Sequence, residues 1–355
     1  MNKRRGYRWS PWVSSRGYTL IELMIAMTIG LILLLGIVTV FVNGSRTRDE
    51  VQRQSQQNDN GRYAMELITE DLHSAGYLGE FDPAPLPTPG TKPDPCLSDV
   101  ASLKIALSQS IQGYDSPTTP PGCLADVKPG TDILVVRRVS SCALGEPGCD
   151  AAAASIPYFQ AAACGSTAEL QASTYTAFYA LDTTTTTLTK HKNDCTTIAP
   201  IRRFRVHIYF IANNDKPGDG IPTLMRAELG AGGFQIVPLV EGIDNLQLEY
   251  AIDSGLLAGT GNNGAPNTYT ADPDTVNACL VDVCQTYWRN VVSVKVNLLA
   301  RTLTSSLGYT NTKSFTLGNT ALGNANTFGP FNDGFRRNIY SATVRLNNVG
   351  GRNGT

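Results

Sequence analysis

One long apolar segment near the N-terminus constrains this chain more than any other feature. The hydrophobic run from Tyr18 to Val42 is almost uninterrupted. As a helix of about 25 residues at about 1.5 Å per residue, it would be roughly 37 Å long, which exceeds the bilayer hydrocarbon core of about 30 Å. The sequence therefore predicts one membrane-spanning helix.

The charges that flank this helix set the direction of its insertion. No acidic residue precedes it, whereas several basic ones do: Lys3, Arg4, Arg5, Arg8 and Arg16. Positively charged flanks stay on the cytoplasmic side of the membrane. We therefore expect residues 1–17 in the cytoplasm and the rest of the chain across the inner membrane.

The residues that open the apolar run do not fit an ordinary secretory signal. Such a signal has its small-residue cleavage site after the apolar segment, whereas the small residue here, Gly17, precedes it. A cut after Gly17 would create an α-amino group on Tyr18, about one helical turn before Glu22. A carboxylate in a membrane segment usually has a partner. We expect that amine, from the same or a neighbouring chain, to be the partner of Glu22; the alternative is a plain signal anchor that tolerates the acid.

The stretch Gly17-Tyr18-Thr19-Leu20-Ile21-Glu22-Leu23 resembles the class III signal of type IV prepilins and type II secretion pseudopilins. The resemblance implies that prepilin peptidase cuts between Gly17 and Tyr18 and that Tyr18 is then N-methylated. It also implies that Glu22 neutralises the N-terminus of a subunit during assembly. Tyr18 stands where phenylalanine is usual in that signal, and the helix lacks the internal proline of many major pilins.

Past Val42 the sequence predicts that the helix continues with an amphipathic pattern. Apolar residues recur at helical spacing with charged residues between them, and Gly76 is a typical C-terminal stop. The apolar stripe is expected to pack on a globular domain. Its residues are Ala64, Leu67, Ile68, Leu72 and Ala75, and the charged residues between them are Arg62, Glu66, Glu70 and Asp71.

Beyond a proline-rich connector at residues 83–95, strand patterns dominate. Residues 230–233 are predicted to form a hairpin turn and residues 213–220 a longer one. The predicted fold class is α+β: a long N-terminal helix, membrane-spanning in its first half, packed on an antiparallel β-sheet head domain with disulfide-bonded insertions. The predicted strands are Asp132–Arg138, Tyr175–Leu181, Arg203–Ile211, Thr223–Leu229, Phe234–Leu239, Leu246–Ile252, Val291–Leu299 and Ser341–Leu346.

The chain is thus expected to have four parts. Residues 1–17 form a cytoplasmic leader peptide that is removed, and residues 18–43 form the transmembrane or filament-core helix. Residues 44–80 are its amphipathic continuation. Residues 81–355 form a periplasmic or extracellular head, with a cysteine-rich insertion at about 96–195.

The cysteines all lie in the part of the chain that the topology sends to an oxidising compartment, and their even number there indicates disulfides. Zinc is disfavoured, because no C-x2-C pair occurs and the histidines lack ligand spacing. The shortest loops suggest Cys142 with Cys149 and Cys279 with Cys284. The candidate cysteines are Cys96, Cys123, Cys142, Cys149, Cys164, Cys195, Cys279 and Cys284, with Cys96–Cys123 and Cys164–Cys195 as the remaining pairs.

No catalytic or nucleotide-binding motif occurs in the sequence, so we expect no enzyme activity, no cofactor and no metal. The net charge of −1 gives no basic field for nucleic acid, whose binding stays uncertain. The arginines at 202–205 and 336–337 are expected on solvated strand faces. The oxygen-rich loop 213–220 lacks EF-hand spacing, and a solvated hairpin is favoured there over a calcium site.

Later blocks of the chain add a second resemblance, to the PilW family of type IV pilus minor pilins. It implies a single-pass protein of the inner membrane, with a cytoplasmic N-terminus and a periplasmic head, that prepilin peptidase processes. It also implies partners: other minor pilins, the major pilin and a tip adhesin, in a complex that primes assembly and caps the fibre at the cell surface. The pili would support twitching motility, adhesion or DNA uptake. The blocks are residues 75–77, 224–226, 239–250 and 336–345.

Two other readings remain open at this stage. One is a type II secretion pseudopilin of the J type, which shares the signal. The other is a binding or adhesin module at the tip, in which residues 96–195 contact a surface, DNA or a partner.

Overall fold

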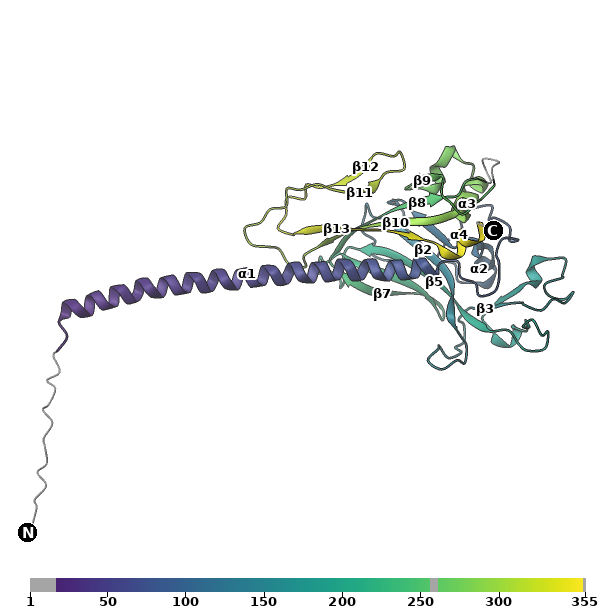
Figure 1. Ribbon diagram of the computed structural model, residues 1–355, viewed down its shortest axis with the longest axis horizontal. Coiled ribbons are helices and arrows are strands. Elements are labelled where there is room, and N and C mark those ends of the chain that lie inside the picture. The colour runs from purple at the N-terminus through teal and green to yellow at the C-terminus, as the bar shows by residue number, and fades with distance from the viewer. Residues whose placement is uncertain (1–16, 256–260, 354–355) are drawn as a thin grey trace, which may run out of the picture. The chain divides into compact units, whose positions relative to one another are not determined.

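The computed structural model describes residues 17–255 and 261–353, whose secondary structure is shown in Figure 1. The chain forms two compact units, residues 1–52 and residues 53–355. Helix α1 (Leu20–Ser74) is continuous through the boundary between them. The described part of the first unit is mainly the N-terminal part of this helix, and the second unit holds the rest of α1 and the strands.

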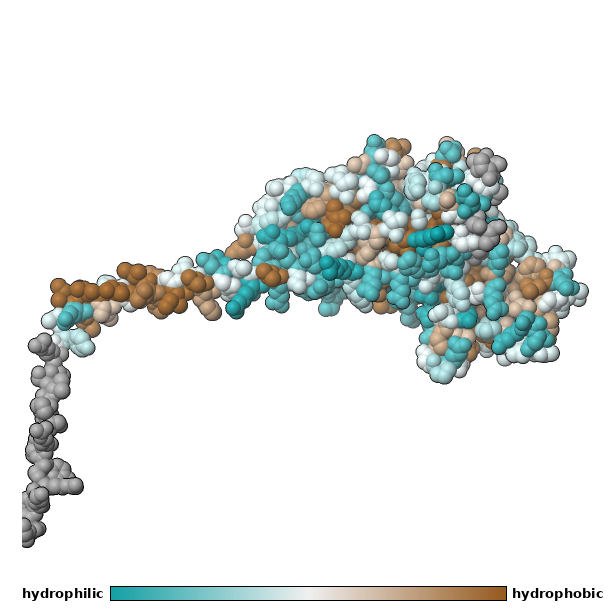
Figure 2. Space-filling model, viewed as in Figure 1, coloured by the Kyte–Doolittle hydropathy of each residue, from teal (hydrophilic) through white to brown (hydrophobic). Residues whose placement is uncertain are grey.

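In the first unit, α1 exposes apolar side chains around its circumference. Leu20, Leu35 and Phe41 are 76%, 68% and 75% exposed. Figure 2 shows this stretch as a hydrophobic surface, drawn in brown. By length and by its mean hydropathy of 2.8 the segment could cross a membrane, and none of its apolar window is buried within the described chain. Burial of these side chains therefore requires lipid or other helices.

The second unit contains a seven-stranded antiparallel sheet among the described residues. Five strands follow the order β1-β2-β5-β3-β4. Strand β6 pairs with β5 on the same edge as β3, and β7 pairs with β6. The strands are β1 (Ile111–Tyr114), β2 (Ile133–Ala143), β3 (Tyr158–Ala161), β4 (Tyr179–Asp182), β5 (Ile201–Ala212), β6 (Thr223–Gly230) and β7 (Gly233–Glu241).

A second, four-stranded antiparallel sheet has the order β13-β10-β8-β9, and β11 and β12 form a separate two-stranded ribbon. Its strands are β8 (Ile243–Ile252), β9 (Thr268–Thr270), β10 (Val291–Arg301) and β13 (Arg337–Arg345), and the ribbon is β11 (Phe315–Asn319) and β12 (Ala325–Phe328). The short helices of the unit are α2 (Val100–Ala106), η1 (Tyr175–Ala177), η2 (Thr185–Thr187), η3 (Pro273–Ala278), α3 (Val281–Arg289) and α4 (Asn347–Asn353).

The main core lies between the two sheets, where the C-terminal half of α1 also packs (Figure 1). Ala64, Ile68 and Leu72 of α1 are fully buried there. Alternation along β2 sends Leu134 and Val136 into this core and their neighbours Ile133 and Val135 into a second cluster on the opposite face of the first sheet. Strand β2 of the first sheet is therefore buried on both faces. Full burial of a side chain of this size contributes about 1.5–3 kcal/mol.

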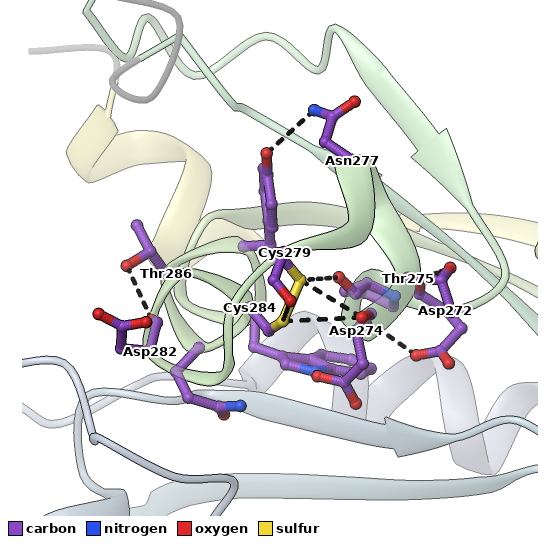
Figure 3. The surroundings of a disulfide bond; sticks show 12 residues. Asp272, Asp274, Thr275, Asn277, Cys279, Asp282, Cys284 and Thr286 are labelled. Carbon is purple, nitrogen blue, oxygen red and sulfur yellow. Dashed lines mark hydrogen bonds between the residues drawn. A yellow bond between two sulfur atoms is a disulfide. The ribbon is translucent and has the colours of Figure 1, made fainter.

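Four disulfides join neighbouring cysteines of the described chain, two of them the pairs that the shortest loops suggest and two the remaining pairs. The Cys279–Cys284 bond joins η3 to α3 (Figure 3). The other three lie within residues 96–195, which also supply β1 to β4 to the first sheet. The bonds are Cys96–Cys123, Cys142–Cys149, Cys164–Cys195 and Cys279–Cys284.

The predicted α+β class and most of the predicted strands are confirmed. The Gly230–Gly233 turn joins β6 to β7, and residues 213–220 lie between β5 and β6. One strand prediction is wrong in its first half: residues 175–177 form the 3-10 helix η1, and β4 begins only at Tyr179. Tyr175 is exposed, so it lacks the strand partner and the buried face that would hold it extended.

Candidate functional site

The N-terminus of α1 is closed by two residues that hydrogen-bond to each other. Thr19 precedes the first helical residue, and Glu22 lies three positions later. Glu22 Oε2 accepts from the Thr19 N–H and from the Thr19 hydroxyl, each at 2.9 Å, and the Glu22 N–H donates to Thr19 Oγ1 at 3.3 Å. This arrangement is a capping box, which satisfies N–H groups that no helix carbonyl can reach.

The capping role of Glu22 was not predicted, although its signal is present in the sequence as a threonine three residues before a glutamate. The sequence pattern alone pairs the carboxylate only with the amine that a cut would create on Tyr18. In the uncleaved chain, the structure shows that this carboxylate stabilises the first turn of the helix. Any account of Glu22 must therefore separate its charge from its capping hydrogen bonds.

Gly17 and Tyr18 lie directly before this cap and outside the helix. Tyr18 is 90% exposed, and a Cβ added at Gly17 would meet nothing within 4 Å. The peptide bond between them is thus accessible within the described unit. The structure brings Gly17, Tyr18 and Glu22 together at one helix end; their processing and assembly roles remain predictions. The remaining leader residues, 1–16, lie outside the described residues.

In the second unit, polar side chains tie α1 to both sheets. The Gln57 side chain is buried and its Nε2 donates to the carbonyl oxygens of Ala300, at 2.7 Å, and Arg336, at 3.1 Å. Asn60 Nδ2 donates to the Glu241 carbonyl at 3.0 Å. These bonds link the helix to β10, to the residue before β13 and to β7. The helix is therefore held in register by directional contacts as well as by its apolar stripe.

A buried carboxylate fixes the end of α1 against the first sheet. Arg138 Nε donates to Asp71 Oδ1 at 2.6 Å, Tyr209 OH donates to Oδ2 at 2.9 Å, and His207 Nδ1 lies 2.7 Å from the same oxygen. Burial alone would raise the pKa of Asp71, but hydrogen bonds and charges from His207 and Arg138 hold it well below its usual range. Burial and the neighbouring Asp71 charge raise the pKa of Tyr209.

The sequence pattern puts Asp71 among the charged positions between the apolar ones, yet it is 4% exposed. Its position is three residues after Ile68, which puts it on the buried stripe at helical spacing. Only its polarity suggested otherwise. The partners that stabilise it come from β2 and β5, distant in sequence, so no local pattern could reveal them.

The expectation that Arg336 and Arg337 lie on a solvated strand face is wrong for Arg337, whose side chain is 2% exposed. Arg337 Nε donates to Asp244 Oδ2 at 2.6 Å, and its NH1 donates to Asp333 Oδ1 at 2.7 Å. Lys128 also pairs with Asp244. Arg337 therefore forms buried ion pairs at the start of β13, where its side chain cannot contact a nucleic acid.

In the oxygen-rich loop at residues 213–220, side-chain oxygens accept hydrogen bonds from backbone N–H groups in and next to the loop. Asp219 accepts from the N–H groups of Lys216 and Ile221, at 2.8 and 2.9 Å, and Asn214 Oδ1 accepts from the Gly220 N–H at 2.9 Å. Among the described residues, one group has metal-ligand spacing, Cys142, Glu146 and Cys149. Both of its cysteines are in a disulfide, so neither offers a thiolate.

Comparison with known protein families gives matches in two separate parts of the chain. A family model described as type IV pilus-assembly protein W, PilW, matches residues 208–348. A model of the prokaryotic N-terminal methylation motif matches residues 12–38. The chain is therefore similar to type IV pilins, with an N-terminal methylation motif and a C-terminal region that resembles PilW. No curated protein matches it at a significant level.

One solved structure similar to this chain is a type IV-like pilin from Thermus thermophilus. The two are 10% identical, the match covers 82% of this chain and 96% of that one, and the TM-score is 0.31. A likeness of that size is too weak to bear on the fold, which rests on the elements described above.

The PilW match begins within β5 and ends within α4, so it covers β6, β7 and the second sheet. The methylation-motif match contains Gly17, Tyr18 and Glu22 and most of the exposed apolar stretch. The motif and the apolar helix together fit a membrane-anchored pilin.

Proposed function

We propose that this protein is a PilW-type minor pilin of the tip and priming complex that initiates assembly of a type IV pilus. The observation that carries the proposal is the first unit: an exposed apolar helix whose capped N-terminus directly follows the Gly17–Tyr18 bond. A helix of this kind needs lipid before assembly and the helices of other pilins after it.

The first step is processing. Prepilin peptidase cuts between Gly17 and Tyr18 on the cytoplasmic side, and the amine of Tyr18 is methylated. The cut removes the basic leader and leaves the apolar helix on the mature chain. The helix then begins with a positive amine one residue before Thr19 and with the Glu22 carboxylate in its first turn.

The second step is assembly, for which the charge of Glu22 is needed. A glutamine at this position would satisfy a capping box as well as a glutamate does. A carboxylate instead costs about 2.5–3.5 kcal/mol at the centre of a bilayer and less near its interface. In surroundings of low dielectric constant the carboxylate attracts the amine of its own or a neighbouring subunit strongly. That attraction draws the helices of other minor pilins and the major pilin into register with this one.

The experiment compares two substitutions that separate charge from capping. Glu22→Gln keeps a capping side chain and removes the charge, whereas Thr19→Ala keeps the charge and removes the reciprocal cap. Each variant replaces the wild-type gene in a strain with type IV pili. Co-purification of the other minor pilins and surface piliation are measured.

We expect Glu22→Gln to lose most co-purification and piliation, and Thr19→Ala to retain both. The reverse pattern would mean that Glu22 acts through its cap, and the assembly mechanism would be wrong. A J-type pseudopilin is the competing function, and the PilW match favours a pilus over it. Deletion of the gene should therefore abolish piliation and leave type II secretion intact.

A further inference from the structure

A small cavity lies on the outer face of the second sheet, beside the β11–β12 ribbon. Its volume is about 250 Å³. Strand alternation puts Tyr250, Val294 and Val344 into the core and their neighbours on this outer face. The cavity is therefore built on the sheet itself, in the part of the chain that matches the PilW family, and outside residues 96–195.

The strand register aligns the lining residues in two rows. In one row, Ala251 of β8 pairs with Tyr269 of β9 and with Ser293 of β10. In the next row, Lys295 of β10 pairs with Glu249 of β8 and with Thr343 of β13. The small side chain of Ala251 leaves room between the tyrosine and the polar row.

The β11–β12 ribbon closes one side of the cavity and helps to hold the Glu249 carboxylate in place. Asn319 of β11 donates from Nδ2 to Glu249 Oε1 at 2.9 Å, and Lys295 Nζ donates to Oε2 at 2.7 Å. Gly318, at φ +70°, lets the ribbon approach, because a Cβ there would lie 2.5 Å from Glu249 Oε2. Both carboxylate oxygens are thus held in place, which preorganises the polar row.

Tyr269 is anchored by its own strand and by the segment that follows it in sequence. β9 has three residues, all paired with β8, and Asp272 just beyond it accepts a hydrogen bond from the Asp274 N–H at 3.0 Å. The Cys279–Cys284 disulfide then closes η3 onto α3 (Figure 3). This anchoring keeps the ring of Tyr269 at the cavity although it is 72% exposed.

Several polar groups in the cavity remain available to a ligand. Within the described chain, the hydroxyls of Tyr269, Ser293 and Thr343 make no hydrogen bond, and each can both donate and accept. The side-chain carbonyl of Asn319 can accept, and the Lys295 ammonium has further N–H groups to donate. The one negative and one positive charge cancel, so the cavity favours neither an anion nor a cation.

We propose that this cavity binds a neutral sugar residue of a carbohydrate. A pyranose ring presents an apolar C–H face, which stacks on the exposed ring of Tyr269, and an edge of hydroxyls that both donate and accept. The mixed donors and acceptors of the polar rows match that edge, and an aromatic side chain with one apolar and one polar end suits it. The volume lies just below the range of about 300–1,000 Å³ for drug-sized ligands, so it holds one or two sugar rings.

The sugar-binding proposal does not depend on the assembly role of the helix, and the two can fail separately. The test uses the full chain, extracted in a zwitterionic detergent without a sugar headgroup. Binding of glucose, galactose, mannose and N-acetylglucosamine is measured by saturation-transfer NMR and titration calorimetry. The variants are Tyr269→Ala, Tyr269→Phe and Ser293→Ala, with Tyr175→Ala as a matched control at another exposed tyrosine.

We expect at least one of these sugars to bind the wild type with millimolar affinity. Tyr269→Ala should weaken it at least about tenfold, which corresponds to about 1.4 kcal/mol, whereas Tyr269→Phe should keep most of the binding because the stacking face remains. Ser293→Ala should weaken binding, and Tyr175→Ala should leave it unchanged. Wild-type protein that binds none of the four sugars, or equal binding by Tyr269→Ala, would overturn the proposal.

Discussion

The ring of Tyr340 occupies the space that a side chain at position 61 would need. A Cβ added at Gly61 of α1 would lie 2.2 Å from Cε2 of Tyr340 on β13. The same tyrosine donates its hydroxyl to Asn58 Oδ1 at 2.7 Å, one helical turn earlier in α1. The helix can therefore approach β13 this closely only because residue 61 is a glycine.

Gly61→Ala should lower the free energy of unfolding of the second unit. Overpacking costs about 1–3 kcal/mol, and the better helix propensity of alanine returns up to about 1 kcal/mol. In a Tyr340→Ala background the clash is gone, so the same substitution should be neutral or stabilising. Denaturant unfolding of the four proteins in this double-mutant cycle checks both results, and equal costs in the two backgrounds would show that the contact is unimportant.

Asp71→Ala should destabilise the second unit by about 3 kcal/mol, because it leaves Arg138 without its charge partner and removes an acceptor from Tyr209. Glu70→Ala, at the exposed neighbouring position, is the matched control and should change stability by less than about 0.5 kcal/mol. Thermal unfolding measures the difference. Equal effects at the two positions would contradict the buried network.

The same carboxylate predicts a pH dependence. The folded pKa of Asp71 lies below the value of 3.8 expected for the unfolded chain. The folded state therefore binds fewer protons, and the stabilisation is present above the unfolded pKa and is lost as the pH falls below about 4. The stability difference between wild type and Asp71→Asn should shrink between about pH 5 and pH 2. A difference that stays constant over that range would refute the assigned network.

The disulfides should contribute according to the length of the loop that each one closes. Cys164 and Cys195 are 31 residues apart, and Cys279 and Cys284 are 5 apart. Loop-closure entropy then gives about 4 kcal/mol for the first bond and about 2 kcal/mol for the second. Paired Cys→Ala variants test the order by denaturant unfolding. Alkylation of exported wild-type protein without reductant should label no cysteine, and labelled thiols would contradict the pairing.

The parts of the structure that could be predicted from sequence are those with local patterns. In the apolar helix and in long alternating strands such as β5 and β10, the spacing of the apolar residues itself indicates the secondary structure and the buried positions. Strands of three or four residues, such as β1, β3 and β9, carry too little periodicity, and their neighbours in the sheet hold them extended. The buried side chains of Asp71 and Arg337 were missed for a related reason, since their partners come from distant segments.

The candidate sites show the same limit. Gly17, Tyr18 and Glu22 were found because their order along the chain is itself the signal. The cavity beside Tyr269 combines four strands and a ribbon, and its rows exist only through the register between them. At most two of the residues that line the cavity lie close together in the sequence. The cavity can therefore be recognised only in the folded chain.

The most direct test of the pilin account is the intact mass of the mature protein. Protein extracted from the membrane of a strain with prepilin peptidase should lack residues 1–17, begin at Tyr18 and carry one added methyl group, and it should keep the leader when the peptidase gene is deleted. A mature chain that begins after Val42, or one that retains its leader in both strains, would contradict the account.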